Sequence, residues 1–216
     1  MAVLTIRLWP DEVLRRKADQ VEIVDDQVRR VLDDMAETMY RQNGIGLAAP
    51  QVGISRRIVT LDVPPDDILG DDGEGEGVGD AGGAAVGAAE GAVEGAVESP
   101  VEGIVPAAST KTAQPGSGLI LAVNPRITAR EGRLVITEGC LSFPGLEIDI
   151  LRSERVTVEY MDESGAPRVL AAVGLLAVCF QHEIDHLDGT VFTDRVGLVR
   201  RRLALRDYER MRRSEA

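Results

Sequence analysis

The feature that most constrains the fold is a segment from Asp66 to Gly118, whose composition differs from everything around it. It holds 11 carboxylates, one lysine, 13 of the chain's 23 glycines and no aromatic residue. Such a segment buries too little apolar surface to offset the entropy lost on ordering, so we expect a disordered acidic loop. Because the entropy of loop closure grows slowly with length, a tolerated surface insertion is the simpler interpretation. The alternative is that its charge repels or recruits a partner.

The rest of the chain is nearly neutral and has the composition of one globular domain. The net charge is −12, of which the acidic segment carries −10. The longest apolar run, Val169 to Phe180, falls well short of the roughly 20 residues that cross a bilayer. The first residues lack the apolar stretch of a secretory signal, and two cysteines cannot form a disulfide framework. We therefore expect a cytoplasmic protein with no membrane partner.

The residues on either side of the acidic segment predict a β-hairpin. Arg57–Val63 and Leu119–Pro125 are both rich in Ile, Val and Leu, as is typical of strands, and the segment joins them. Before them, apolar residues from Val28 to Met39 follow helical spacing, with Asp25 or Asp26 available as the N-cap.

The order of the remaining elements favours an α+β domain, because strands and helices do not alternate regularly. Turn signals at Glu131-Gly132 and at Glu163-Ser164-Gly165 separate the expected strands. The further predicted elements are strands at 125–129, 134–137, 155–161 and 168–172, and helices at 175–187 and 196–213.

Two histidines four residues apart indicate a metal site on the penultimate helix. His182 and His186 share one helical face, and Glu183 between them can reach a metal-bound water. These are the chain's two histidines, so chance spacing is a poor explanation, although a pair of unrelated surface histidines is the alternative. By contrast, the apolar residues before them, Cys179 included, are more simply core.

A metal ion held by two histidines needs a third protein ligand if one position is to stay open for water. Cys140 is the best candidate, because glycine and proline around it mark a turn, although a cysteine in such a loop can equally be inert. The small residues from Asn43 to Gly53 permit close approach of a ligand backbone, and Gln51 among them can donate a hydrogen bond to a developing oxyanion. A plain turn between a helix and a strand also explains that run.

Together, these three segments resemble peptide deformylases, which remove the N-formyl group from nascent polypeptides. The family's signatures are Gly-x-Gly-Leu-Ala-Ala-x-Gln, Glu-Gly-Cys-Leu-Ser and Gln-His-Glu-x-Asp-His-Leu-x-Gly. They stand intact at Gly44–Gln51, Glu138–Ser142 and Gln181–Gly189. The resemblance covers all but the acidic insertion. It implies a single domain over residues 1–216, interrupted at 66–118, with small antiparallel sheets packed around a central metal-binding helix and with a C-terminal helix.

The resemblance also implies how the chemistry is divided among residues. Cys140, His182 and His186 would hold one divalent metal ion with water in the fourth position. The ion in the family is usually Fe²⁺, and Zn²⁺, Ni²⁺ or Co²⁺ also suit one thiolate and two imidazoles. Glu183 would be the general base and acid, which takes the water's proton and passes it to the leaving amine.

Substrate contacts are implied in the same way. Gln51 and the backbone N–H of Leu141 would stabilise the oxyanion. The stretch Leu146–Arg152 carries two carboxylates where some relatives have basic residues, which leaves the peptide preference open. The residues expected to contact the peptide or line a methionine pocket, each of which also suits plain core packing apart from Gly46, are Ile45, Gly46, Ile136, Leu175, Val178 and Cys179.

Two other classes of protein are alternatives to a deformylase. A gluzincin-like endopeptidase would need a downstream glutamate as third ligand, and the candidates are Glu209 and Glu215 in or beside an arginine-rich helix. A non-catalytic relative would be expected to lack a ligand, Glu183 or Gln51, and all of these are present.

The C-terminal helix is basic, although the chain as a whole is acidic. It carries seven arginines against three acidic residues after Val199. A solvated helix face is one interpretation, in which Leu198, Val199, Leu203 and Leu205 partly supply the packed side. The other is docking to the ribosome, whose phosphates attract arginine-rich helices, and the resemblance supports it because some deformylases are thought to dock in this way. The expected partners are therefore nascent formyl-methionyl polypeptides and the ribosome.

Overall fold

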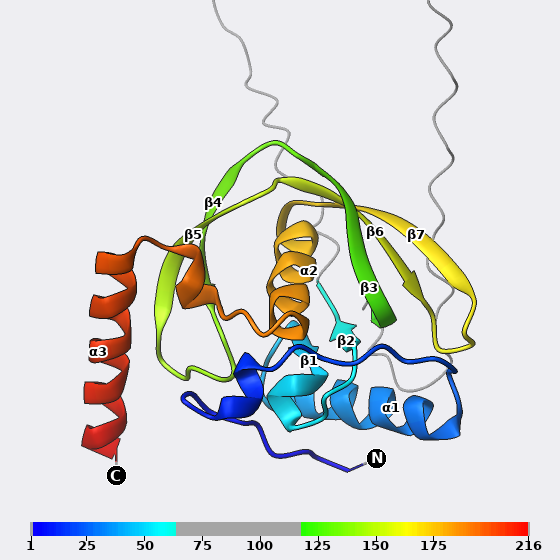
Figure 1. Ribbon diagram of the computed structural model, residues 1–216, viewed down its shortest axis with the longest axis horizontal. Helices are drawn as coiled ribbons and strands as arrows, with labels where there is room; N and C mark the ends of the chain where they lie inside the picture. Colours follow the sequence, from blue (N-terminus) through cyan, green and yellow to red (C-terminus); the bar gives the residue numbers. More distant parts are fainter. Residues whose placement is uncertain (1, 64–117, 216) are drawn as a thin grey trace, which may run out of the picture.

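The computed structural model describes residues 2–63 and 118–215, so the predicted disordered loop lies outside the described residues apart from Gly118. In the described part, helix α2 lies at the centre, two antiparallel sheets surround it, and α1 and α3 lie at the edges (Figure 1). This is the expected α+β arrangement. No helix in this part is both long and apolar enough to cross a membrane. Short 3-10 helices are η1 (Glu12–Arg15), η2 (Ala49–Val52) and η4 (Phe192–Arg195).

Helix α1 (Asp26–Arg41) forms where the sequence predicts it. The side chain of Asp25 accepts a hydrogen bond from the backbone N–H of Val28, which satisfies one of the free donors at the helix start. One face of the helix packs against β1 and β2. The buried residues that form this face recur at helical spacing and include Val28, Leu32, Met35 and Met39.

The larger sheet has the strand order β1-β2-β3-β6-β7, and each neighbouring pair is antiparallel. Strands β2 and β3 form the predicted hairpin, with Leu61 opposite Ile120, so the acidic segment joins two adjacent strand ends. β3 continues through the position where a separate strand is predicted at residues 125–129. The strands are β1 (Gly46–Ala48), β2 (Ile58–Leu61), β3 (Ile120–Glu131), β6 (Arg155–Met161) and β7 (Pro167–Val173).

The second sheet consists of β4 (Leu134–Gly139) and β5 (Glu147–Arg152). Along β5, exposed and buried residues alternate strictly, and Ile148, Ile150 and Arg152 are the buried ones. Neither β5 nor β1 is among the strands predicted from sequence. The pairing brings residue 138 opposite residue 148, close to the central helix.

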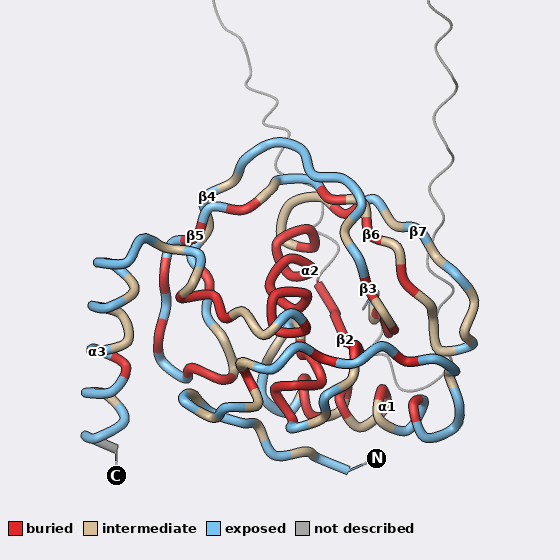
Figure 2. The backbone as a smooth tube through the Cα atoms, viewed as in Figure 1, coloured by how far each residue is buried: buried red, intermediate tan, exposed pale blue. Residues whose placement is uncertain are grey.

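Helix α2 (Gly174–Leu187) is buried along almost its whole length (Figure 2). Every residue from Leu176 to Leu187 is buried, because β1, β2, β6 and β7 all contact the helix. A helix enclosed in this way can be apolar on several faces, and any polar side chain on it needs a partner inside the protein.

Helix α3 (Leu198–Glu215) packs on the outer side of the small sheet (Figure 1). Tyr208 is 1% exposed, and its ring lies 5.2 Å from that of Phe143. The expectation that Leu198, Val199 and Leu203 supply the packed side is wrong. These side chains are exposed, because a different face of the helix is directed at the domain. The residues that do pack are Ala204, Leu205, Tyr208 and Met211.

We predict that replacing residues 66–118 with a short turn preserves the fold. The described strand ends already lie opposite each other, so a tight connection can close the hairpin without moving either strand. Shortening the loop should raise the free energy of unfolding by about 2 kcal/mol, because closing a shorter loop costs less entropy. Urea unfolding of the intact and shortened proteins measures this difference. A large loss of stability would show instead that the segment packs on the domain.

Candidate active site

Three side chains with metal-binding atoms meet beside helix α2. His182 and His186 lie one turn apart on the helix, with ring centroids 5.0 Å apart. Cys140 comes from the turn after β4, and its Sγ lies 3.3 Å from Nε2 of His186. One ligand atom from each residue lies within 4.8 Å of the other two. A thiolate and two imidazoles in this arrangement fit an ion with four ligands and leave the fourth position to water.

The turn that carries Cys140 is fixed on both sides. Its carbonyl accepts a hydrogen bond from the backbone N–H of Phe143, and the carbonyl of Ser142 accepts one from Trp9. The Phe143 ring is fully buried and stacks on Trp9, with ring centroids 5.4 Å apart. The position of Cys140 therefore depends on packing against the N-terminal segment.

Behind His182 lies a buried chain of charged groups. Nδ1 of His182 is 2.8 Å from a carboxylate oxygen of Glu138, so Nε2 is the nitrogen left for a metal ion. Arg152 donates two hydrogen bonds to Glu138, at 2.6 and 2.9 Å, and a third to Asp185. Burial favours the neutral acid, but the hydrogen bonds from Arg152 and His182 outweigh it and lower the pKa of Glu138 to about 2. Arg195 also pairs with Asp185.

The second histidine, His186, has no carboxylate partner of the kind that Glu138 provides for His182. His186 is buried, and both its burial and the neighbouring His182 lower its pKa well below the ordinary value. Both effects favour the neutral ring, which is the form of imidazole that binds a metal ion.

Glu183 lies on the same stretch of helix, with its carboxylate buried against the backbone of β1. A methyl group at Gly46 would come within 2.5 Å of a carboxylate oxygen of Glu183, so only glycine allows this approach. Burial raises the pKa of Glu183 to about 7, although His182 opposes the shift.

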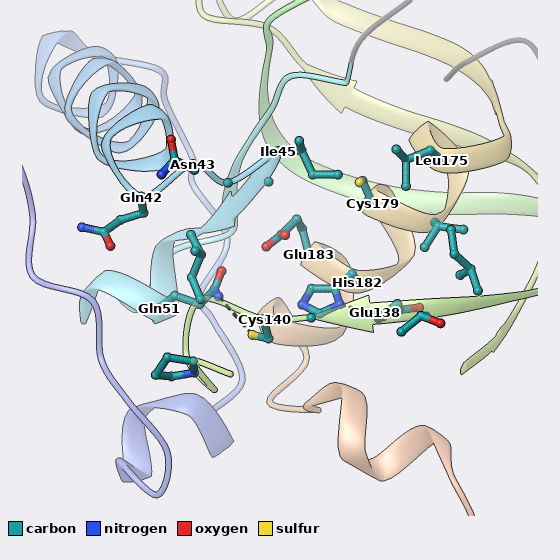
Figure 3. A pocket seen from close by; sticks show the side chains of 18 of the residues that line it. Gln42, Asn43, Ile45, Gln51, Glu138, Cys140, Leu175, Cys179, His182 and Glu183 are labelled. Carbon is teal, nitrogen blue, oxygen red and sulfur yellow. Dashed lines mark hydrogen bonds and ion pairs between the residues drawn. The ribbon is translucent and has the colours of Figure 1, made fainter. Parts of the chain in front are cut away.

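Gln51, in η2, is buried and held in one orientation. Its Oε1 accepts a hydrogen bond from the backbone N–H of Ala48 at 2.8 Å. Its Nε2 is thereby directed at Sγ of Cys140, at 3.5 Å, and at Oγ of Ser142, at 3.3 Å. Figure 3 shows the amide pointing toward the cysteine.

These groups open onto a hollow of about 490 Å³ between β1, β4 and α2 (Figure 3). Cys179 is buried in its wall, and burial raises the pKa of its thiol, which keeps it neutral and apolar. All the predicted site residues line this hollow except His186, which contacts Cys140 in its wall. The lining includes Leu141, predicted to stabilise the oxyanion, and the whole set predicted to contact the substrate, which is Ile45, Gly46, Ile136, Leu175, Val178 and Cys179.

No role is predicted from sequence for Glu138, Arg152 or Asp185, which form the buried chain behind His182. Glu138 lies in the Glu-Gly-Cys-Leu-Ser motif and Asp185 lies between the two histidines, so their closeness to the proposed ligands in sequence could have indicated a role. Arg152 gives no local signal, because its partners are 14 and 33 residues away.

Comparisons with known proteins agree on one family. The model of the polypeptide deformylase family matches residues 3–202. The chain is 34% identical over 209 residues to the peptide deformylase of Thermodesulfovibrio yellowstonii, covering 97% of this chain and 98% of that one. It is 38% identical over 211 residues to the peptide deformylase of Alkalilimnicola ehrlichii, covering 98% and 92%.

A solved structure extends the agreement to the fold. The peptide deformylase of Ehrlichia chaffeensis in complex with actinonin superposes with a TM-score of 0.72 and 31% sequence identity, over 98% of each chain. The sequence match and the structural match each cover nearly the whole chain, and the chain belongs to the polypeptide deformylase family, whose members remove the N-formyl group from nascent polypeptides.

Proposed function

We propose that this chain hydrolyses the formyl group of N-terminal formyl-methionine at one divalent metal ion held by Cys140, His182 and His186. The observation that carries the proposal is the convergence of these three ligand atoms, within 4.8 Å of one another, beside a buried glutamate and an oriented glutamine. When bound, a divalent ion at such a site acts as a Lewis acid and makes water easier to deprotonate near neutral pH. Fe²⁺ is the ion we propose, and Zn²⁺, Ni²⁺ and Co²⁺ also suit these ligands.

Glu183 is the proton carrier in this proposal. A carboxyl group with a pKa of about 7 can accept a proton from water and return it at neutral pH, which general acid-base catalysis requires. The close backbone of Gly46 limits where the carboxylate can move. Glu183 therefore takes the proton of the attacking water and delivers it to the leaving amine of the peptide.

Two hydrogen-bond donors are assigned to the formyl oxygen. Gln51 is supported by its geometry, because Ala48 occupies its carbonyl oxygen and leaves its Nε2 directed at the site. The backbone N–H of Leu141, next to Cys140, is the second. Donors fixed before the reaction stabilise the developing negative charge without having to reorganise. The apolar wall of the hollow, which includes Leu175 and Val178, takes the methionine side chain, and Gly46 contacts the peptide backbone.

The direct test is formate release. We predict that the Fe²⁺-loaded protein, prepared without air, releases formate from a short formyl-Met peptide and leaves its peptide bonds intact. Formate is measured enzymatically and peptide products by mass spectrometry. Cleavage of internal peptide bonds without formate release would favour the endopeptidase alternative instead.

Ligation and proton transfer can be separated by substitution. Glu183→Ala should lower kcat by roughly 10²- to 10⁴-fold and keep the metal, because Glu183 is assigned to the water. Cys140→Ala and His186→Ala should lose the metal, because each removes a ligand. Elemental analysis alongside the kinetics distinguishes the two outcomes. A metal-free Glu183→Ala protein together with a fully loaded Cys140→Ala protein would contradict the assigned roles.

Gly46 offers a separate test of the position of the Glu183 carboxylate. Gly46→Ala should lower kcat at unchanged metal content, because the added methyl group displaces the Glu183 carboxylate and leaves the three ligands in place. Gly197→Ala is the matched control, since a methyl group there meets no atom within 4 Å. Full activity of Gly46→Ala would mean that the carboxylate position is not critical.

We further propose that the arginine-rich face of α3 contacts the ribosome. Its arginines at positions 202, 206, 210 and 213 are exposed, whereas Tyr208 and Leu205 pack on the domain. Removing the helix would therefore damage the fold around Phe143, and charge substitution is the cleaner experiment.

We predict that replacing these four arginines with glutamine weakens co-sedimentation with ribosomes at low salt and leaves formate release from a free peptide intact. The dependence of binding on salt should become shallower, because fewer phosphates are neutralised by the protein. The control is a variant with as many arginines replaced elsewhere on the surface. Equal co-sedimentation of the α3 variant and the intact protein across a salt series would contradict the proposal.

A further inference from the structure

A second hollow, of about 480 Å³, lies beside the turn between β3 and β4 and shares no lining residue with the proposed active site. Four arginines, Arg130, Arg133, Arg152 and Arg195, are among its lining residues, and no acidic residue is. The proposed deformylation uses neither this hollow nor Arg130 or Arg133, and of its lining arginines Arg152 acts on the active site by holding Glu138.

The acidic groups near the hollow do not neutralise it. Glu138 pairs with Arg152, Asp185 pairs with both Arg152 and Arg195, and neither carboxylate lines the hollow. Arg130 donates to the neutral amide of Gln181 at 3.0 Å. Among the described residues, no carboxylate forms an ion pair with Arg130 or Arg133. The wall therefore carries more positive than negative charge.

The arginines also repel one another. Partial burial lowers the pKa of Arg130, and the nearby Arg195 and Arg152 act in the same direction against the attraction of Asp185. Arg195 nevertheless keeps 44% of its side chain exposed, and Arg133 is exposed on the turn. Charges of one sign that face a partly enclosed space are relieved by an anion with several acceptor oxygens.

The close spacing of these groups depends on the turn itself. Gly132 adopts a φ of +65°, and a side chain there would meet the carboxylate of Glu154 at 2.6 Å. Glycine thus allows a sharp bend between β3 and β4, which continue along the same partner segment, and Arg130 and Arg133 on either side of the bend both line the hollow. Glu154 itself lies outside the lining.

We propose that this hollow binds a phosphate group through Arg130, Arg133 and Arg195. Arg130 and Arg133 have no carboxylate partner among the described residues, so their guanidinium groups are available for phosphate oxygens, whereas Arg195, two of whose nitrogens donate to Asp185, adds positive charge and its remaining nitrogen. The same chemistry is offered by free phosphate and by the phosphodiester of an RNA strand.

The test uses the full-length, zinc-loaded, ¹⁵N-labelled protein, titrated separately with orthophosphate and with a short single-stranded RNA. The amides of Gly132 and Ser153, which line the hollow, should shift and saturate, whereas those of Gly46 and Leu141 report any binding at the metal site. Arg133→Gln should raise the Kd roughly tenfold, because one charge-assisted hydrogen bond is removed. Arg30→Gln removes a similar exposed charge from α1 and should change it by less than about twofold.

Each arm has a defined outcome. Tighter binding of RNA, with the same dependence on Arg133, identifies a phosphodiester as the source, and equal or tighter binding of orthophosphate identifies free phosphate. If Arg133→Gln loses its zinc, Arg130→Gln provides the same comparison. Unmoved Gly132 and Ser153 amides, or equal weakening by Arg133→Gln and Arg30→Gln, would overturn the proposal.

Discussion

The arrangement of the whole domain depends on the buried guanidinium of Arg152. Its side chain is 3% exposed, and it binds Glu138 on the neighbouring strand and Asp185 on the central helix. Burying these charges is costly unless each one is paired, and breaking a buried pair typically costs about 3–5 kcal/mol. The pairing therefore allows one register between the small sheet and α2, because any other leaves a charge unpaired inside the protein.

The same chain of charges connects the packing to the chemistry. Glu138 receives Arg152 on one side and Nδ1 of His182 on the other, so the position of the small sheet sets the orientation of a proposed metal ligand. Cys140 is the residue that directly follows β4. Strand β4 thus helps to position two of the three proposed ligands: Cys140 by chain connection and His182 through the hydrogen bond to Glu138. A strand that is fixed in place therefore keeps both ligands in place.

Sequence patterns predicted the elements whose signals are local. Helix α1 and the β2–β3 hairpin follow from periodicity and branched residues, and the His-Glu-x-x-His spacing located the chemistry on α2. Strand β1 was missed because Gly46–Ala48 has no strand propensity and forms only by pairing with β2. Strand β5 was missed because its alternation of polar and apolar residues breaks at Leu151 and Arg152, where the apolar side chain is exposed and the charged one is buried. The buried ion pairs of Arg152 could not be predicted from sequence, since its partners Glu138 and Asp185 are 14 and 33 residues away and lie on different elements.

The position of the acidic insertion follows from how the hairpin is closed. Before the chain leaves the described part, the backbone N–H of Asp62 donates to the carbonyl of Ile45 at 2.9 Å, and its carboxylate accepts from the hydroxyl of Tyr40. Ile45 is 38% exposed and lines the proposed active site, so Asp62, four residues before the insertion, is held beside that hollow. Asp62 is therefore held in place by contacts within the domain, whatever the length of the insertion. The entropy of closing the loop grows only logarithmically with that length. Extra residues can therefore enter at this hairpin without loosening β1, on which the placement of Glu183 depends.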